Sequence, residues 1–142
     1  MSRAELIAFL GRQRLGVVSS ISADGGPQSA VVGIATSQTG EILFDTLGGS
    51  CKATNLRRDP RVSLVVWQDE RTAQLQGTAD EPIGRERARL LEIYFAAYPD
   101  GRERLAWPDI THFRITPTWA RYSDFATAPQ PTIVTFDFRQ AY

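Results

Sequence analysis

The sequence contains few of the residues from which catalytic side-chain centres are usually built. Among its 142 residues there is one cysteine, Cys51, and one histidine, His112. A single cysteine cannot form an intramolecular disulfide, and these two residues are too few for a zinc site or a Cys–His nucleophile. We therefore set metal and thiol chemistry aside.

The sequence also lacks an excess of charge of either sign. Sixteen Lys and Arg residues balance sixteen Asp and Glu residues, so no overall field attracts nucleic acid or anionic lipid. The basic run 57–61 is interrupted by Asp59, and there is neither an apolar run of about 18 residues nor a charged-then-apolar leader. We expect a cytoplasmic, soluble protein that binds neither nucleic acid nor membranes, in which any anion site is local.

The chain length fits one domain over residues 1–142, and its Gly and Pro residues fall between periodic segments. Ser2 followed by Glu5 has the spacing of a capping box, which predicts a helix at the start of the chain. Two further helices are expected over 51–58 and 84–98. The β-rich segments that predict strands are 15–22, 28–37, 41–47, 61–69, 72–82, 109–125 with an interruption at Pro117, and 131–138.

The connections between these strands are short, which favours hairpins because parallel pairing needs long crossovers. One strand should be half solvated, because Leu75 and Gly77 alternate with Gln74, Gln76 and Thr78. Six or seven hairpin-connected strands with three short helices predict a mainly β protein, an antiparallel closed or partly closed barrel.

The segment 45–62 carries the strongest functional signal. A strand ends in two glycines, and Ser50, Lys52 and Asn55 open a short helix. A phosphate could bind here, because the start of such a helix offers unpaired backbone N–H groups. The hydroxyl, ammonium and amide of the three side chains would add further donors. In the alternative interpretation Ser50 only caps the helix and Lys52 is solvated. The spacing of these residues alone does not decide between the phosphate site and the helix cap.

Three segments, "SADGGPQSAVV", "ILFDTLGGSCKATNLRRDPRVSLVV" and "LQGTADE", in this order and spacing resemble the pyridoxamine 5′-phosphate oxidase-like superfamily of split β-barrels, over roughly Leu6 to Phe125. The resemblance implies a Greek-key split barrel. It also implies a homodimer that binds FMN at its interface, or in some branches the deazaflavin F420, and acts on a small molecule.

The resemblance further implies which residues contact the cofactor. Ser50 and Lys52 match the phosphate-binding run, with Cys51 where some members have arginine. The strand after "DGGP" would run along the isoalloxazine, and Gln76 or Gln74 would reach the flavin across the interface, although both also fit a solvated face. The implied cofactor-binding residues are Ala30, Val31, Val32, Gly33, Asp45, Thr46, Ser50, Cys51, Lys52, Asn55, Gln76 and Trp119.

The residues that bind the substrate phosphate in true pyridoxamine-phosphate oxidases are not matched. Their pattern is a tyrosine, an arginine four residues later and a serine four beyond; here Tyr94, Tyr98 and Arg102 stand at these positions. A phenol replaces a guanidinium poorly, although Arg102 can supply the charge from the next turn. Ala30 and Ala35 stand where the oxidases have Arg and Lys, and the C-terminal Arg-x-His element has no counterpart. We expect the scaffold without vitamin B6 activity.

The remaining aromatic residues and the histidine have simpler interpretations. Most large aromatics should fill the core or an interface, with Trp119 and Tyr122 as the best candidates for ligand contact. His112, among alternating apolar residues, is expected to be a hydrogen-bonded strand residue.

Three functions fit the sequence. The leading hypothesis is an FMN-dependent oxidoreductase of unassigned substrate. The second is an F420-dependent reductase, in which Arg57, Arg58 and Arg61 would meet the poly-acidic tail of the cofactor. The third is a flavin- or haem-binding module without turnover.

Overall fold

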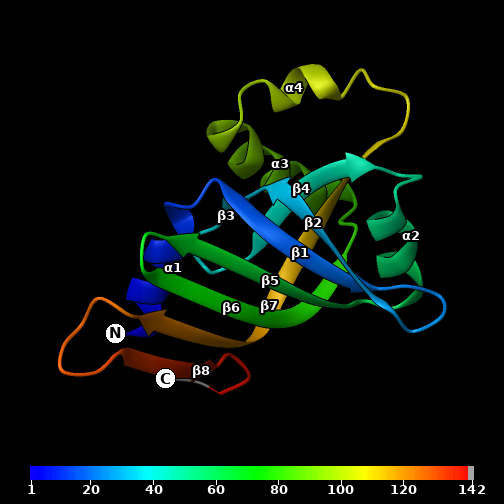
Figure 1. The fold of residues 1–142 in the computed structure, drawn as a ribbon. Coiled ribbons are helices and arrows are strands. Elements are labelled where there is room, and N and C mark those ends of the chain that lie inside the picture. Colours follow the sequence, from blue (N-terminus) through cyan, green and yellow to red (C-terminus); the bar gives the residue numbers. More distant parts are fainter. Residues whose placement is uncertain (141–142) are drawn as a thin grey trace.

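The computed structural model describes residues 1–140, which build one strongly curled antiparallel sheet with helices at its ends (Figure 1). The strand order is β2-β1-β5-β6-β7-β4-β3, with β8 paired to β7. The edge strand β2 also contacts β4, so the sheet closes part of the way into a barrel, as predicted. The strands are β1 (Leu15–Ile21), β2 (Pro27–Gly33), β3 (Ala35–Thr36), β4 (Ile42–Leu47), β5 (Arg61–Gln68), β6 (Arg71–Asp80), β7 (Ile110–Asp124) and β8 (Thr132–Asp137), and the helices are α1 (Arg3–Gly11), α2 (Cys51–Arg58), α3 (Gly84–Ala97) and α4 (Gly101–Arg104).

Helix α1 begins with the predicted capping box. The Ser2 Oγ accepts a hydrogen bond from the Glu5 N–H at 3.1 Å, and the Glu5 carboxylate accepts one from the Ser2 N–H at 2.6 Å. The helix then buries Leu6, Phe9 and Leu10 completely. It therefore covers part of the apolar interior of the barrel, which stabilises a helix of this length far more than propensity does.

Alternation along the strands decides which side chains form the core. Val18, Leu64, Leu75 and Ala120 are successive register partners on β1, β5, β6 and β7, and all four are buried. Their neighbours in the chain point to the outer face. A slip of one residue would exchange the two faces, so the core fixes the register.

Helix α3 forms a second apolar layer against the β3–β4 hairpin. Its Leu90, Tyr94 and Phe95 pack with Ala35 and Leu43, and Figure 1 shows α3 and α4 together at one end of the sheet. Strand β4 is thus buried on both faces, because Leu43 points to α3 while its neighbours Ile42 and Phe44 point into the barrel.

The predicted interruption at Pro117 is a β-bulge within a continuous strand. Gly77 of β6 pairs with Pro117, whereas Gln76 pairs with Trp119, which leaves Thr118 as the extra residue. A Cβ at position 77 would lie 2.2 Å from the Thr116 carbonyl oxygen. The bulge therefore requires glycine on the opposite strand.

This contact generates a stability prediction. Gly77→Ala should lower the free energy of unfolding by about 1–3 kcal/mol, as overpacking against rigid backbone does. The control is Gly11→Ala at the end of α1, where nothing lies within 4 Å of an added Cβ and no loss is expected. Urea unfolding of both variants measures the effect, and equal midpoints for the two would contradict the assignment of the bulge.

Candidate functional site

The two glycines before α2 allow a close approach between loops. The Gly48 N–H donates to the Asp109 carbonyl at 2.6 Å, and a Cβ on Gly48 would lie 2.6 Å from the Asp109 Oδ1. Ser50 follows as N-cap: its Oγ accepts from the Ala53 N–H at 3.2 Å and lies 2.9 Å from the Thr46 Oγ1. Packing and capping therefore explain this turn, and they set the direction of α2.

A buried amide fixes α2 against the β1–β2 hairpin. Asn55 is 4% exposed, and its Nδ2 donates to the Ser20 Oγ at 3.1 Å and to the Gln28 Oε1 at 2.8 Å. Both amide hydrogens of Asn55 are used in this way. To donate to a cofactor, Asn55 would have to give up its hydrogen bond to Ser20 or to Gln28. The role that the structure gives it is to hold the first turn of α2 beside β2.

A cavity of about 370 Å³ lies at this junction, which we call the Lys52 cavity. Within residues 1–140, the Lys52 ammonium forms no ion pair, and the partial positive charge of the α2 N-terminus lies next to it. The cavity thus combines small and polar groups with an uncompensated cation. Its lining residues are Val18, Ser20, Gln28, Ser29, Ala30, Cys51 and Lys52.

Strand β2 divides the predicted residues Ala30 to Gly33 between two faces. Ala30 lines the Lys52 cavity and Val32 is buried in the core. Val31 points outward with 63% of its surface exposed, and Gly33 lies under the ring of Tyr98, whose hydroxyl is 3.0 Å from the position of an added Cβ. The structure therefore brings Ala30, Cys51 and Lys52 together and places Val31 on the outer surface.

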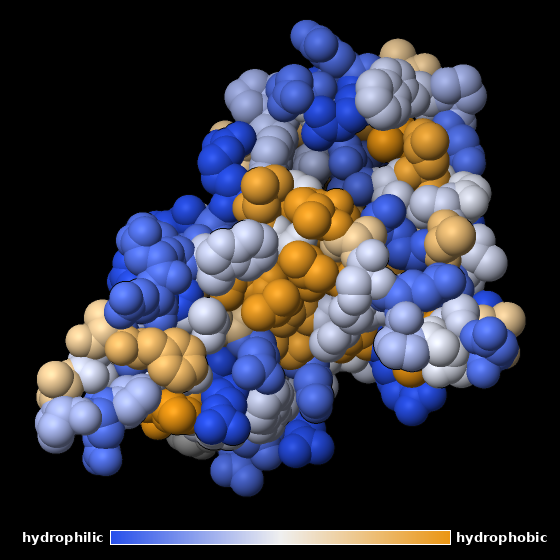
Figure 2. Space-filling view, in the orientation of Figure 1, coloured by the Kyte–Doolittle hydropathy of each residue, from blue (hydrophilic) through white to orange (hydrophobic). Residues whose placement is uncertain are grey.

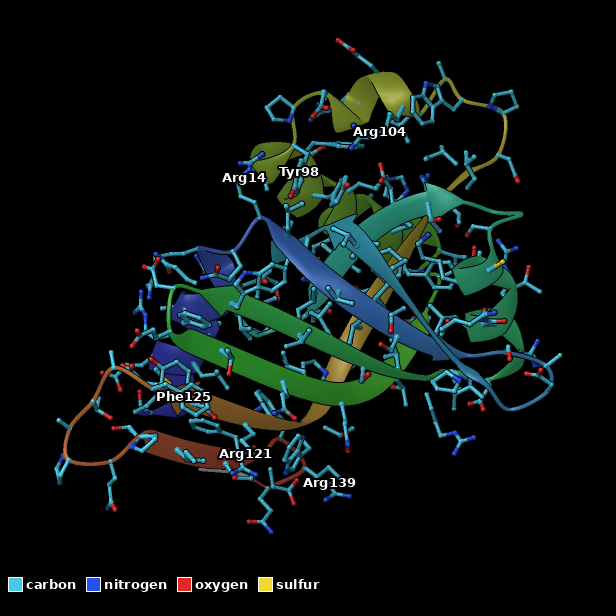
Figure 3. The ribbon with its side chains drawn as sticks, in the orientation of Figure 1. Arg14, Tyr98, Arg104, Arg121, Phe125 and Arg139 are labelled. Atoms are coloured by element: carbon cyan, nitrogen blue, oxygen red, sulfur yellow. The ribbon has the colours of Figure 1, made fainter. Side chains whose placement is uncertain are left out.

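The end of β4 faces α4. The Asp45 carboxylate accepts a hydrogen bond from the Arg104 Nε at 2.6 Å, and the Arg104 Nη2 lies 3.3 Å from the Tyr94 hydroxyl (Figure 3). Burial, with the Asp45 charge nearby, raises the pKa of Tyr94 to about 12. Asp45 and Thr46 do not line the Lys52 cavity, so their predicted contact with a cofactor stays a prediction.

Gln76 and Trp119 lie on the outer face of the sheet. They are register partners on β6 and β7, and they line a separate depression of about 390 Å³ with Ser63 and Ser19. Neither residue lines the Lys52 cavity, so their predicted contact with a cofactor stays a prediction. Tyr122 is core, packed edge-on against Phe9 with ring centroids 5.4 Å apart.

Arg102 does not restore the missing guanidinium beside Tyr98. Its Nη2 lies 3.2 Å from a Glu92 carboxylate oxygen, and its guanidinium lies 4.8 Å from the Phe95 ring centroid. The guanidinium next to Tyr98 comes instead from Arg14, at 4.8 Å from the ring centroid (Figure 3).

The expectation for His112 was wrong. It is 6% exposed, and neither ring nitrogen has a hydrogen-bond partner. The side chain projects from β7 among the rings of Tyr94 and Phe95, whose centroids are 5.5 and 6.3 Å away, and these offer no acceptor. Burial lowers the pKa of this imidazole below its usual value.

Three residues around these cavities were missed by sequence reasoning. Ser20 had a signal, since it is a polar residue at an inward, buried position of β1, whereas Gln28 is exposed and had none. Arg14 had none, because it precedes β1 and its surroundings are set by α3, more than 80 residues later. In the described chain, no group of three His, Cys, Asp or Glu side chains is placed to hold a metal, and no helix is long and apolar enough to span a membrane.

The curled antiparallel sheet is that of a split-barrel protein, and the Lys52 cavity is its candidate cofactor site. Residues 2–124 match the family model of pyridoxamine 5′-phosphate oxidase, so the chain belongs to this family. Among curated proteins, none matches the sequence.

Solved structures share the fold. A haem-binding protein from Mycobacterium smegmatis is 18% identical to this chain and superposes with a TM-score of 0.77. The match covers 93% of this chain and 57% of that protein, so the chain spans little more than half of its length. The conserved hypothetical protein Rv2991 from Mycobacterium tuberculosis has 25% identity and a TM-score of 0.75, covering 99% and 95% of the two chains. A pyridoxamine 5′-phosphate oxidase-related, FMN-binding protein from Nostoc punctiforme has 12% identity and a TM-score of 0.69, covering 95% and 87%.

The buried imidazole generates a prediction about pH. The pKa of His112 is lowered in the folded state, so the unfolded chain binds the proton more readily. The contribution of His112 to the free energy of unfolding is therefore fully present above about pH 6.5 and decreases as the pH drops below this value. The loss should reach at most about 1.4 kcal/mol per pH unit. In His112→Leu this part of the pH dependence should disappear. Urea unfolding at pH 8 and pH 5 measures both proteins, and identical pH dependences would contradict the prediction.

Proposed function

We propose that the protein is a flavin-dependent oxidoreductase that binds FMN with the phosphate in the Lys52 cavity. The observation that carries this proposal is the Lys52 ammonium, which forms no ion pair among residues 1–140 and lies beside a helix N-terminus and the small residue Ala30 of β2. Bound FMN would supply the redox chemistry, transferring electrons or hydride between a reduced nicotinamide or similar donor and a small organic acceptor. Lys52 and Cys51 would hold its phosphate, and β2 would support its ring.

The surface of β1 and β2 supports a homodimer in this proposal. Leu15 and Val31 are 55% and 63% exposed, and Val31 is register partner of Val17, which pairs in turn with Val65. Figure 2 shows the resulting apolar patch in the middle of this face. Such a patch on an edge of the sheet is typical of an interaction surface. A second copy would cover it and bring its own Gln76 toward the cofactor.

The substrate is not pyridoxamine phosphate in this proposal. Arg102 is paired with Glu92, and Ala35 offers no charge where the oxidases have a lysine. A phosphate ester would therefore meet a different set of donors from the one that defines the namesake reaction.

The ion pairs of the structure favour FMN over F420. The cations that would meet the acidic tail are already occupied: Arg57 binds Glu81 at 2.6 Å, Arg61 binds Asp59 at 2.7 Å, and Arg58 donates to the Ile21 carbonyl. A poly-anionic tail would have to displace carboxylates that are in place.

A haem-binding module is the other alternative, because the Mycobacterium smegmatis neighbour is described as haem-binding. The one histidine of the sequence, His112, is buried under α3 among aromatic rings and is not accessible to a haem iron. This observation favours the flavin.

The Lys52 ammonium generates a prediction about cofactor affinity. Lys52→Met should weaken FMN binding roughly ten- to a hundredfold, the value of a charge-assisted hydrogen bond of about 1.5–3 kcal/mol. Lys52→Arg keeps the charge and should retain most of the affinity. Arg85→Gln removes one charge from the exposed surface of α3 and serves as control. Quenching of flavin fluorescence measures all four proteins. An unchanged affinity in Lys52→Met would reject this site.

The exposed apolar patch generates a prediction about assembly. The unmodified protein should have about twice the 15.8 kDa mass of one chain, and Val31→Glu should yield monomers because a charge would be buried at the interface. Ile83→Glu is the control, since Ile83 is 82% exposed and lies away from β2, at the start of α3. Light scattering after size exclusion measures the masses; a monomeric unmodified protein would exclude the dimer.

A further inference from the structure

A second and larger cavity lies on the other side of the molecule from α2, between the loop that joins α1 to β1, strand β3 and the C-terminal half of α3. We call it the Arg14 cavity. Its volume is about 810 Å³, within the range of small-molecule sites. The walls are mixed, with Ile93, Ala96 and Ala97 of α3 as partly or fully exposed apolar residues and with Thr36 and Ser37 as polar ones.

The charge of this cavity is one-sided, although the chain has no net charge. Three arginines line it and no acidic residue does. Arg89 is compensated by Glu41 and Glu86, at 3.0 and 2.6 Å. In the described residues, neither Arg12 nor Arg14 forms an ion pair.

Arg14 contacts an aromatic ring and a backbone carbonyl and has no counter-ion among residues 1–140. Its guanidinium lies 4.8 Å from the Tyr98 ring centroid and donates to the Ala97 carbonyl at 3.4 Å, while the Tyr98 hydroxyl donates to the Arg14 carbonyl (Figure 3). A guanidinium has five N–H donors, and only one of them is used here. The planar guanidinium suits a carboxylate or phosphate, because its remaining N–H groups can form two parallel hydrogen bonds to such a group.

We infer that the Arg14 cavity binds a small organic anion, with its carboxylate or phosphate on Arg14 and its apolar body against Ile93, Ala96 and Ala97. An organic ligand suits this cavity better than an inorganic ion, because its apolar body would remove these three residues from water.

The cavity is connected through the chain to the proposed flavin site. Ala30 of β2 lines the Lys52 cavity, and Ile34, four residues further on, lines the Arg14 cavity; an extended chain of that length spans roughly 13 Å. If FMN extends along β2 from the Lys52 cavity, as the proposed function has it, the organic anion would be the acceptor or donor near its ring. This reaction role rests on the proposed function, whereas the binding of the anion does not.

Titration with phenyl phosphate, followed by calorimetry, tests the binding. We expect saturable binding to the unmodified protein, at least tenfold weaker binding in Arg14→Gln and an intermediate value in Arg14→Lys, with phenol as the uncharged probe that does not bind. Arg85→Gln, which removes an exposed charge outside the cavity, should bind as the unmodified protein does. No saturation, or equal losses in Arg14→Gln and Arg85→Gln, would overturn the inference.

A second pair of variants keeps the test independent of Arg14, whose contact with Tyr98 also supports the fold. Ala96 is an exposed residue of α3 at the cavity wall, so Ala96→Phe should fill the cavity and abolish binding of phenyl phosphate. Ala88→Phe, on an exposed position of the same helix outside the cavity, should leave it intact. Binding that survives Ala96→Phe would place the anion elsewhere.

Flavin affinity, measured on the same variants, separates this inference from the proposed function. Arg14→Gln and Ala96→Phe should bind FMN with the affinity of the unmodified protein, because the phosphate is held at Lys52. If phenyl phosphate binds in the Arg14 cavity but FMN does not bind to the protein, the anion site is supported and the flavin function is rejected. If FMN binds and phenyl phosphate does not, the flavin function is supported and the anion site is rejected.

Discussion

The buried amide of Asn55 is the contact on which the candidate cofactor site depends. It joins α2 to Ser20 of β1 and Gln28 of β2, and in doing so it sets the first turn of the helix against the edge of the sheet. A buried amide is costly unless its hydrogen bonds are made, so the arrangement is specific as well as stable. Lys52 lies beside β2 because of this contact.

Strand β2 connects the two cavities of the molecule. It lies at an edge of the sheet, so one side is free of a neighbouring strand over most of its length. Small side chains at Ala30 and Gly33 let other groups approach its backbone, and its continuation into Ile34 leads to the wall of the second cavity. A strand with this position can hold an extended ligand along its length, with polar recognition at both ends.

The cations of the structure differ in whether a carboxylate compensates them. Arg57, Arg89 and Arg104 bind carboxylates at 2.6 to 3.0 Å and join helices to the sheet. Lys52 and Arg14 line cavities and form no ion pair within residues 1–140. Other cations of the described residues also form no ion pair, so it is the position of Lys52 and Arg14 at cavity walls that makes them candidates for anion binding.

Local signals in the sequence determined most of the elements of the barrel. The capping box at Ser2, the hairpin turns and the alternation of Leu75 and Gly77 with glutamines act over a few residues, and strict alternation leaves one register compatible with a buried face. Lys52 was found in the same way, since a helix start after two glycines is a local pattern. The tertiary structure alone decided the rest. The packing of α3 against segments distant in the sequence surrounds His112 with aromatic rings and places Tyr98 beside Arg14. Contacts between segments so far apart leave no pattern within either segment, so the sequence could not predict them.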